Sequence, residues 1–87
     1  MRQQAQLGLM RWIYAHDKQR LIVELSLDPG HSVYELRTDS RGEGVGLRLE
    51  QFLDVTPAFL RHGQIEANLI ASGWTLEFYE RLQPTLH

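Results

Sequence analysis

The alternation of side chains in residues 20–27 constrains the fold of this chain more than any other feature. Leucine and valine occupy every second position, and the positions between them carry mostly polar residues; the apolar set is Leu21, Val23, Leu25 and Leu27. A period of two residues is that of a β-strand with one buried face. We therefore predict a strand here, packed against the core through its leucines.

Three more segments before residue 50 are typical of strands, and the connections between them are short. Residues 7–15, 32–38 and 45–49 are rich in branched and aromatic types. Polar turns separate them, at residues 16–19, 28–31 and 39–44. In the second turn Pro29 is expected to fix φ and Gly30 to supply a positive φ. Connections this short join antiparallel neighbours, so the four strands should form a meander.

The second half of the chain changes to a helical pattern. Thr56 followed by Pro57 is typical of a helix N-terminus, and Gly73 is typical of a C-terminal cap. We predict a helix over 57–72, with an earlier start near Glu50 as the alternative. Residues 74–79 then alternate as a last strand, although a helix over 75–82 is also compatible. The expected fold class is α+β: an antiparallel sheet of four to five strands, with one main helix packed on one face.

The helix carries two apolar stripes, and they suggest different roles. The broader stripe should lie on the sheet, and it comprises Phe59, Leu60, Gly63, Ala67, Ile70 and Ala71. The second stripe lies to one side of it and comprises Ala58, His62, Ile65 and Leu69. Either the last strand or a loop covers this second stripe, or it forms a dimer contact, since apolar patches on small domains often mark association.

The length of 87 residues allows one domain, spanning 1–87, with residues 1–6 expected to be frayed. A domain of this size buries only about 60% of its unfolded surface, so association with a second copy would add useful burial. No apolar run approaches the ~20 residues of a membrane span, and the first residues do not resemble a signal peptide. The chain contains no cysteine, which fits a soluble protein of the reducing cytoplasm.

Residues that carry catalysis or bind metal do not form a recognisable pattern. The four histidines are His16, His31, His62 and His87, and no two are spaced by three or four residues as in a helical metal site. The glycines at 42, 44 and 46 lie between predicted strands, where a hairpin turn is favoured over a phosphate-binding loop. We expect no catalytic residue, no metal and no cofactor, and therefore no enzyme.

Charge and aromatic residues are concentrated near the start of the chain. The first twenty residues carry four basic side chains against one acidic side chain, whereas the rest carries five against ten, for a net charge of −2. Arg11, Trp12, Tyr14, Lys18 and Arg20 lie in the first predicted hairpin. Rings beside cations are typical of surfaces that hold single-stranded nucleic acid. Trp12 and Tyr14 share a face with Met10, however, so a buried core position is favoured for both rings.

Two short stretches resemble a known family. Residues 34–37 read Tyr-Glu-Leu-Arg, and residues 44–52 read Gly-Val-Gly-Leu-Arg-Leu-Glu-Gln-Phe. Their order resembles the transcriptional coactivators that bind single-stranded DNA, with matches at Gly44, Val45, Leu47, Glu50, Gln51 and Phe52. The resemblance implies a four-stranded antiparallel sheet followed by a helix, a dimer, and binding to single-stranded DNA. This chain has Glu43 where the family usually has lysine or arginine.

Two hypotheses for function follow. The first is a non-enzymatic protein-interaction module that binds a second copy of itself or another protein. The expected homodimer is joined through the stripe of Ile65 and Leu69 or through an edge strand. The alternative is a single-stranded nucleic-acid binder that uses the first hairpin together with Arg37, Arg41 and Arg48. The acidic remainder of the chain weighs against the alternative, because affinity for phosphates depends mainly on cationic contacts.

Overall fold

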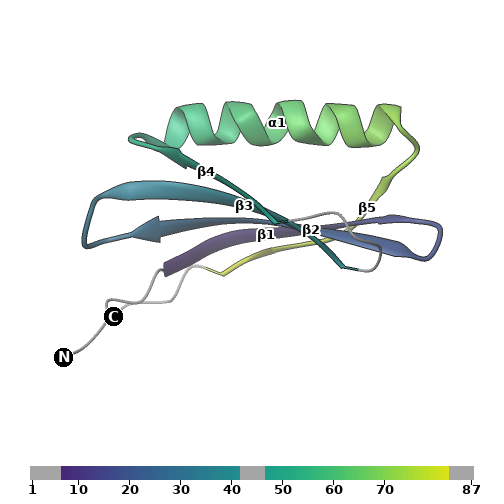
Figure 1. Cartoon of the computed structure of the whole chain (residues 1–87), viewed down its shortest axis with the longest axis horizontal. Coiled ribbons are helices and arrows are strands. Elements are labelled where there is room, and N and C mark those ends of the chain that lie inside the picture. The colour runs from purple at the N-terminus through teal and green to yellow at the C-terminus, as the bar shows by residue number, and fades with distance from the viewer. Residues whose placement is uncertain (1–6, 42–46, 83–87) are drawn as a thin grey trace.

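The computed structural model describes residues 7–41 and 47–82, and it confirms the α+β fold class. Five strands form one antiparallel sheet, and a single helix lies across one of its faces (Figure 1). The elements in chain order are β1 (Leu7–His16), β2 (Gln19–Asp28), β3 (Val33–Arg41), β4 (Arg48–Phe52), α1 (Val55–Ala71) and β5 (Thr75–Arg81). Within these ranges, no helix has both the length and the apolar character needed to cross a bilayer.

The spatial order of the strands is β4-β3-β2-β1-β5. The first four strands form the expected meander, and the chain then returns through α1 to place β5 beside β1. The last segment is thus a strand and not a helix. Its pairing with β1 contains a bulge between Ile13 and Tyr14, and its last described residue, Leu82, donates its backbone N–H to the carbonyl of Leu9 at 2.8 Å.

The turn between β2 and β3 differs in one respect from the prediction. The backbone N–H of Gly30 donates to the Asp28 carboxylate at 3.0 Å, and the His31 ring lies 2.9 Å from the other carboxylate oxygen. This hydrogen bond from His31 is the main cause that lowers the pKa of Asp28. The left-handed backbone position is Ser32, with φ of 55°, and not Gly30. Beyond this turn, β3 continues through residues 39–41, which were predicted as turn, and residues 42–46 lie outside the described ranges.

The helix begins earlier than predicted and ends where expected. Its first residue is Val55 and its N-cap is Asp54, so Thr56 is not the cap. Pro57 is accommodated because the N–H groups of the first turn have no helical partner. At the other end Gly73 adopts a φ of 97°. Trp74 and Gly73 donate to the carbonyls of Leu69 and Ile70, which is the Schellman arrangement that a C-terminal glycine predicts.

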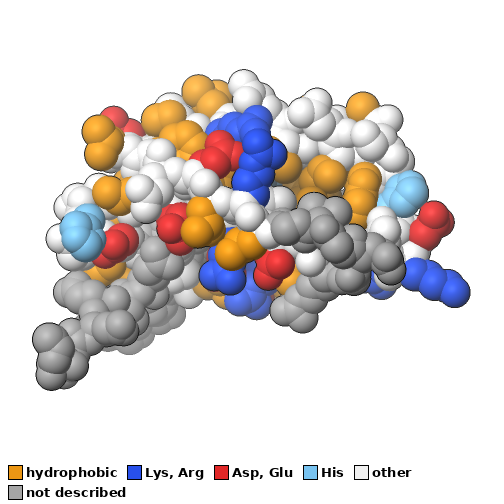
Figure 2. Space-filling model, viewed as in Figure 1, with side chains coloured by type: hydrophobic (Ala, Val, Ile, Leu, Met, Phe, Trp, Pro, Cys, Tyr) orange, Lys and Arg blue, Asp and Glu red, His pale blue; other side chains and the backbone are white. Residues whose placement is uncertain are grey.

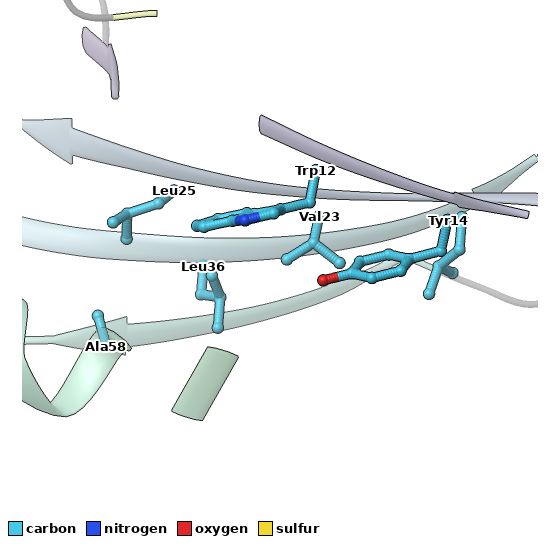
Figure 3. Close-up of a cluster of buried hydrophobic side chains, with 7 residues drawn as sticks. Trp12, Tyr14, Val23, Leu25, Leu36 and Ala58 are labelled. Atoms are coloured by element: carbon cyan, nitrogen blue, oxygen red, sulfur yellow. The ribbon is translucent and has the colours of Figure 1, made fainter. Parts of the chain in front are cut away.

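The core lies between the sheet and α1, and it contains the alternating leucines of β2. Its buried side chains come from β1, β2, β3 and α1, and they are Trp12, Tyr14, Leu21, Val23, Leu25, Leu36 and Ala58. Figure 3 shows a close-up of this cluster. Trp12 and Tyr14 are therefore core residues, as favoured from the sequence, and their rings are not available as a stacking platform for bases.

The helix packs through the stripe that was expected to be peripheral. Ala58 and His62 are buried, and Ile65 and Leu69 pack against the core, whereas Phe59, Leu60 and Ile70 of the broader stripe are exposed. The prediction of helix faces was wrong because it placed the stripe that contains His62 to one side of the sheet contact. In the structure the His62 ring stacks on Trp12 with centroids 3.6 Å apart, and it forms a hydrogen bond to Tyr14. A partnered histidine can be buried, so the narrower stripe faces the sheet.

Candidate interaction surface

Two polar contacts show which side of α1 faces which edge of the sheet. On one side, Arg61 donates from Nε to the Glu50 carboxylate of β4 at 2.9 Å. On the other side, Glu66 accepts a hydrogen bond from the hydroxyl of Tyr14 in β1 at 2.8 Å. Because β4 and β5 are the two outer strands, the Arg61 side faces β4, and the Glu66 side faces β1 and β5.

An exposed apolar surface follows from this orientation. At 100° per residue, Phe59 and Ile70 lie on the same side of the helix as Glu66. From the sheet, Leu76 pairs with Tyr14 and Tyr79 pairs with Trp12, so both point to the helix-covered face. We call these four residues, Phe59, Ile70, Leu76 and Tyr79, the α1–β5 flank. Each is a large apolar or aromatic side chain that is at least 39% exposed.

The flank borders an outer strand of the sheet. β5 pairs with β1 on one side, and among the described residues no further strand lies beyond it in the sheet order. Seven residues at about 3.4 Å each give this edge a length of about 24 Å. An outer strand presents N–H and C=O groups to any strand that approaches it, so apolar side chains beside such an edge favour strand-to-strand association.

A buried polar cluster lies beneath the flank, where α1 meets β1. Tyr14 is 0% exposed, and its oxygen is 2.9 Å from Nε2 of His62 and 2.8 Å from Glu66. The tyrosine hydroxyl has one proton, which it donates to Glu66. Its oxygen therefore accepts from His62, so Nε2 of His62 carries a proton.

The environment of this cluster suits a structural role better than proton transfer. Burial, followed by the hydrogen bond to Glu66, raises the pKa of the Tyr14 phenol far above its usual value. Burial lowers the pKa of His62, although the nearby Glu66 carboxylate opposes that shift. Both shifts favour the neutral side chain at neutral pH. A general acid or base works best with a pKa close to the operating pH, and the Tyr14 phenol moves away from it.

The sheet face opposite the helix carries several of the residues predicted to bind nucleic acid. Arg11 and Arg37 line a shallow cavity of about 360 Å³ on this face, together with Glu24 and Asp39. Arg11 lies 3.3 Å from Glu80 and 3.8 Å from Glu24. Arg20 lies 2.8 Å from Glu77. Carboxylates thus neutralise Arg11 and Arg20, and the face is mixed in charge.

The remaining predicted basic residues are dispersed. Lys18 lies in the turn between β1 and β2, and Arg48 lies on the helix-covered side of β4, where its Nε is 3.9 Å from Glu50. Arg41 ends β3, and its side chain lies outside the described part of the structure. The predicted nucleic-acid residues therefore do not form one continuous basic surface with Trp12 and Tyr14, which are buried.

Neither set of sequence-predicted site residues includes the α1–β5 flank. The predicted interface residues Ala58, His62, Ile65 and Leu69 are inside, against the sheet. Phe59 and Ile70 were assigned to the buried face of the helix, and Leu76 and Tyr79 were read only as strand residues. The sequence contains one signal for the flank, which is that the helix has more apolar residues than one sheet contact can cover.

Comparisons with protein-family models, with curated proteins and with solved structures find no match to this chain. The resemblance to the coactivator family thus stays a prediction. Within residues 7–41 and 47–82, no group of three or more histidine or acidic side chains could hold a metal ion.

Proposed function

We propose that this protein is a non-enzymatic interaction module that acts as a homodimer, joined through the α1–β5 flank and the outer edge of β5. One observation carries the proposal, which is the position of four exposed apolar side chains beside an outer strand. Two copies related by a twofold axis would pair β5 with β5 antiparallel, as isologous contacts require. The two flanks would then cover one another.

The small size of the chain supports the same proposal. A stable contact buries about 800 Å² from each partner, and the accessible surface of this chain is 6100 Å². A single sheet with one helix leaves much apolar surface exposed, and a second copy is the partner that is always present. A cytoplasmic location belongs to the proposal, on the basis of the cysteine-free sequence.

Binding to single-stranded nucleic acid has weaker support. It would need exposed rings and unpaired cations, whereas Trp12 and Tyr14 are buried and Arg11 and Arg20 contact carboxylates. It is therefore an outcome that the experiment must be able to detect. Binding of this kind weakens steeply with salt.

Sedimentation equilibrium over a wide range of protein concentration tests the proposal. The expected result is a mass that rises from 10.1 kDa toward twice that value. Ile70→Glu should abolish the rise, because the substitution occurs twice in a twofold interface. Each lost isoleucine contact is worth about 1.5–3 kcal/mol, so the dimer should weaken by at least about a hundredfold.

Leu60→Glu is the matched control, since Leu60 is 66% exposed, compared with 55% for Ile70, but points away from the sheet. This variant should remain a dimer. A wild-type protein that stays monomeric at high concentration would refute the proposal, and equal weakening by Leu60→Glu would place the contact elsewhere on the helix. Salt-sensitive binding of a short oligonucleotide, lost in Arg11→Gln and Arg37→Gln, would favour the nucleic-acid alternative instead.

A further inference from the structure

A second surface lies on the opposite side of α1, between the C-terminal half of the helix and strands β2 to β4. It is a cavity of about 370 Å³, at the lower end of the range for small-molecule sites. Its apolar lining includes Leu21 from the sheet, Ile65 and Leu69 from the helix, and Trp74 from the start of the last segment.

Small residues on β3 create this space. Along the helix-covered face, β2 and β3 pair as Leu25 with Leu36, then Val23 with Thr38, then Leu21 with Ser40. Both members of the first pair are large and fully buried. In the other two pairs the β3 member is a small hydroxyl residue, so the sheet does not fill the volume beneath Ile65 and Leu69.

The rim of the cavity is positively charged. Two arginines, Arg48 and Arg61, belong to its lining, and no acidic side chain does among the described residues. Glu50 lies between the two guanidinium groups, 2.9 Å from Nε of Arg61 and 3.9 Å from Nε of Arg48. One carboxylate balances only one arginine. The looser partner, Arg48, has a side chain that is 67% exposed and is free to contact a ligand. Figure 2 shows basic side chains next to an acidic one in the upper middle of the view, with hydrophobic side chains beside them.

We propose that this cavity binds a small, flat apolar molecule that carries one anionic group, such as an aryl carboxylate or sulfonate. The ring system would lie against Trp74 and the aliphatic lining, where aromatic contacts add to apolar burial. The anionic group would lie at the rim beside Arg48, where a guanidinium can form paired hydrogen bonds to a carboxylate. The hydroxyls of Thr38 and Ser40 offer further donors. This site is separate from the proposed dimer surface, which lies on the other side of the helix.

A pair of fluorescent probes tests the inference. The first is 1-anilinonaphthalene-8-sulfonate, and the second is N-phenyl-1-naphthylamine, which has the same ring system without the sulfonate. We expect saturable one-to-one binding of both, with the sulfonate bound more tightly. Ser40→Leu, which fills the cavity from the sheet, should weaken both probes by more than about tenfold. Asn68→Phe gives a second test, because the new ring would enter the cavity from an exposed position on α1 and no core residue is changed.

Charge variants separate the anion contact from simple apolar binding. Arg48→Gln should weaken the sulfonate probe about two- to fivefold and leave the neutral probe unchanged. Arg37→Gln is the matched control, since it removes the same charge from the opposite face of the sheet, and it should change neither probe. Ile70→Glu should also leave both unchanged.

Three results would overturn the inference. The first is that neither probe shows saturable binding. The second is that Arg48→Gln and Arg37→Gln weaken the sulfonate probe equally. The third is that Ile70→Glu loses probe binding while Asn68→Phe retains it. The last result would mean that the probes bind the α1–β5 flank. Because mass and probe binding are measured separately, failure of this site and failure of the proposed dimer are distinguishable.

Discussion

Replacement of Tyr14 by phenylalanine tests the contact that orients α1 on the sheet. Tyr14 is fully buried, and its hydroxyl forms one hydrogen bond to His62 and one to Glu66. Phenylalanine keeps the ring and its packing but removes both hydrogen bonds. The variant therefore isolates the polar part of the contact.

The expected loss follows from those two bonds. A hydrogen bond to a charged group is worth about 1.5–3 kcal/mol, and a buried donor left without a partner costs about 1–3 kcal/mol. In Tyr14→Phe the Nε2–H of His62 loses its acceptor, whereas the half-buried Glu66 can turn toward water. We therefore expect a net loss of about 2–4 kcal/mol, out of a total that is roughly 5–15 kcal/mol for a domain.

Urea denaturation followed by tryptophan fluorescence measures this loss. The midpoint should fall while the slope stays the same, because the surface exposed on unfolding does not change. Tyr34→Phe is the matched control, since Tyr34 packs against the core and removal of its hydroxyl breaks no hydrogen bond identified within the described residues. That variant should stay within about 0.5 kcal/mol of the wild type. If Tyr14→Phe also stayed within that range, the polar cluster would not be what holds His62 against the sheet.

Three further predictions concern the same helix. Burial lowers the pKa of His62, so as the pH falls the unfolded chain takes up a proton before the folded protein does. The free energy of unfolding should therefore decrease as the pH drops below about 6.5. Urea titrations at several pH values measure this loss, which should disappear in His62→Gln. Gly73→Ala should lower stability by about 1–2 kcal/mol, because φ is 97° and the new Cβ would lie 3.1 Å from His16. Gly63→Ala should raise stability by about 0.5–1 kcal/mol, because nothing lies within 4 Å of the new Cβ at that position. Thermal melts that rank the two variants in the other order would contradict this prediction. Leu69→Glu should lower stability by about 2–4 kcal/mol, because Leu69 packs against the core. Ile70→Glu should change the stability of the monomer by less than about 0.5 kcal/mol, because Ile70 is exposed. Comparable losses in the two denaturation curves would mean that the helix faces are assigned wrongly.

Local patterns in the sequence were sufficient for most of the architecture. The alternation of Leu21, Val23 and Leu25 predicted a strand and its buried face, and the structure confirms both. Short polar connections predicted the meander, and Gly73 predicted the helix end. These features depend on residues close together in the chain, where backbone geometry and side-chain period act directly.

Two local predictions failed because a neighbouring residue could satisfy the same geometry. Ser32 adopts the left-handed conformation expected of Gly30, and the helix starts at Asp54 and Val55 before the expected cap at Thr56. Proline is tolerated throughout the first helical turn, so its position sets the helix start only to within a few residues.

The face of α1 that packs on the sheet was decided only by the tertiary structure. From the sequence, the broader apolar stripe with Phe59 and Ile70 was the expected contact, and the stripe that contains His62 was expected to lie to one side of it. Burial of His62 depends on Trp12 and on Tyr14, which lies 48 residues away in the chain and contacts it across the interface between the sheet and α1. The free energy of burying a polar group is set by the partner it meets, and that partner is determined only once the sheet and helix are packed together. The same packing decides that Phe59, Ile70, Leu76 and Tyr79 remain on the surface.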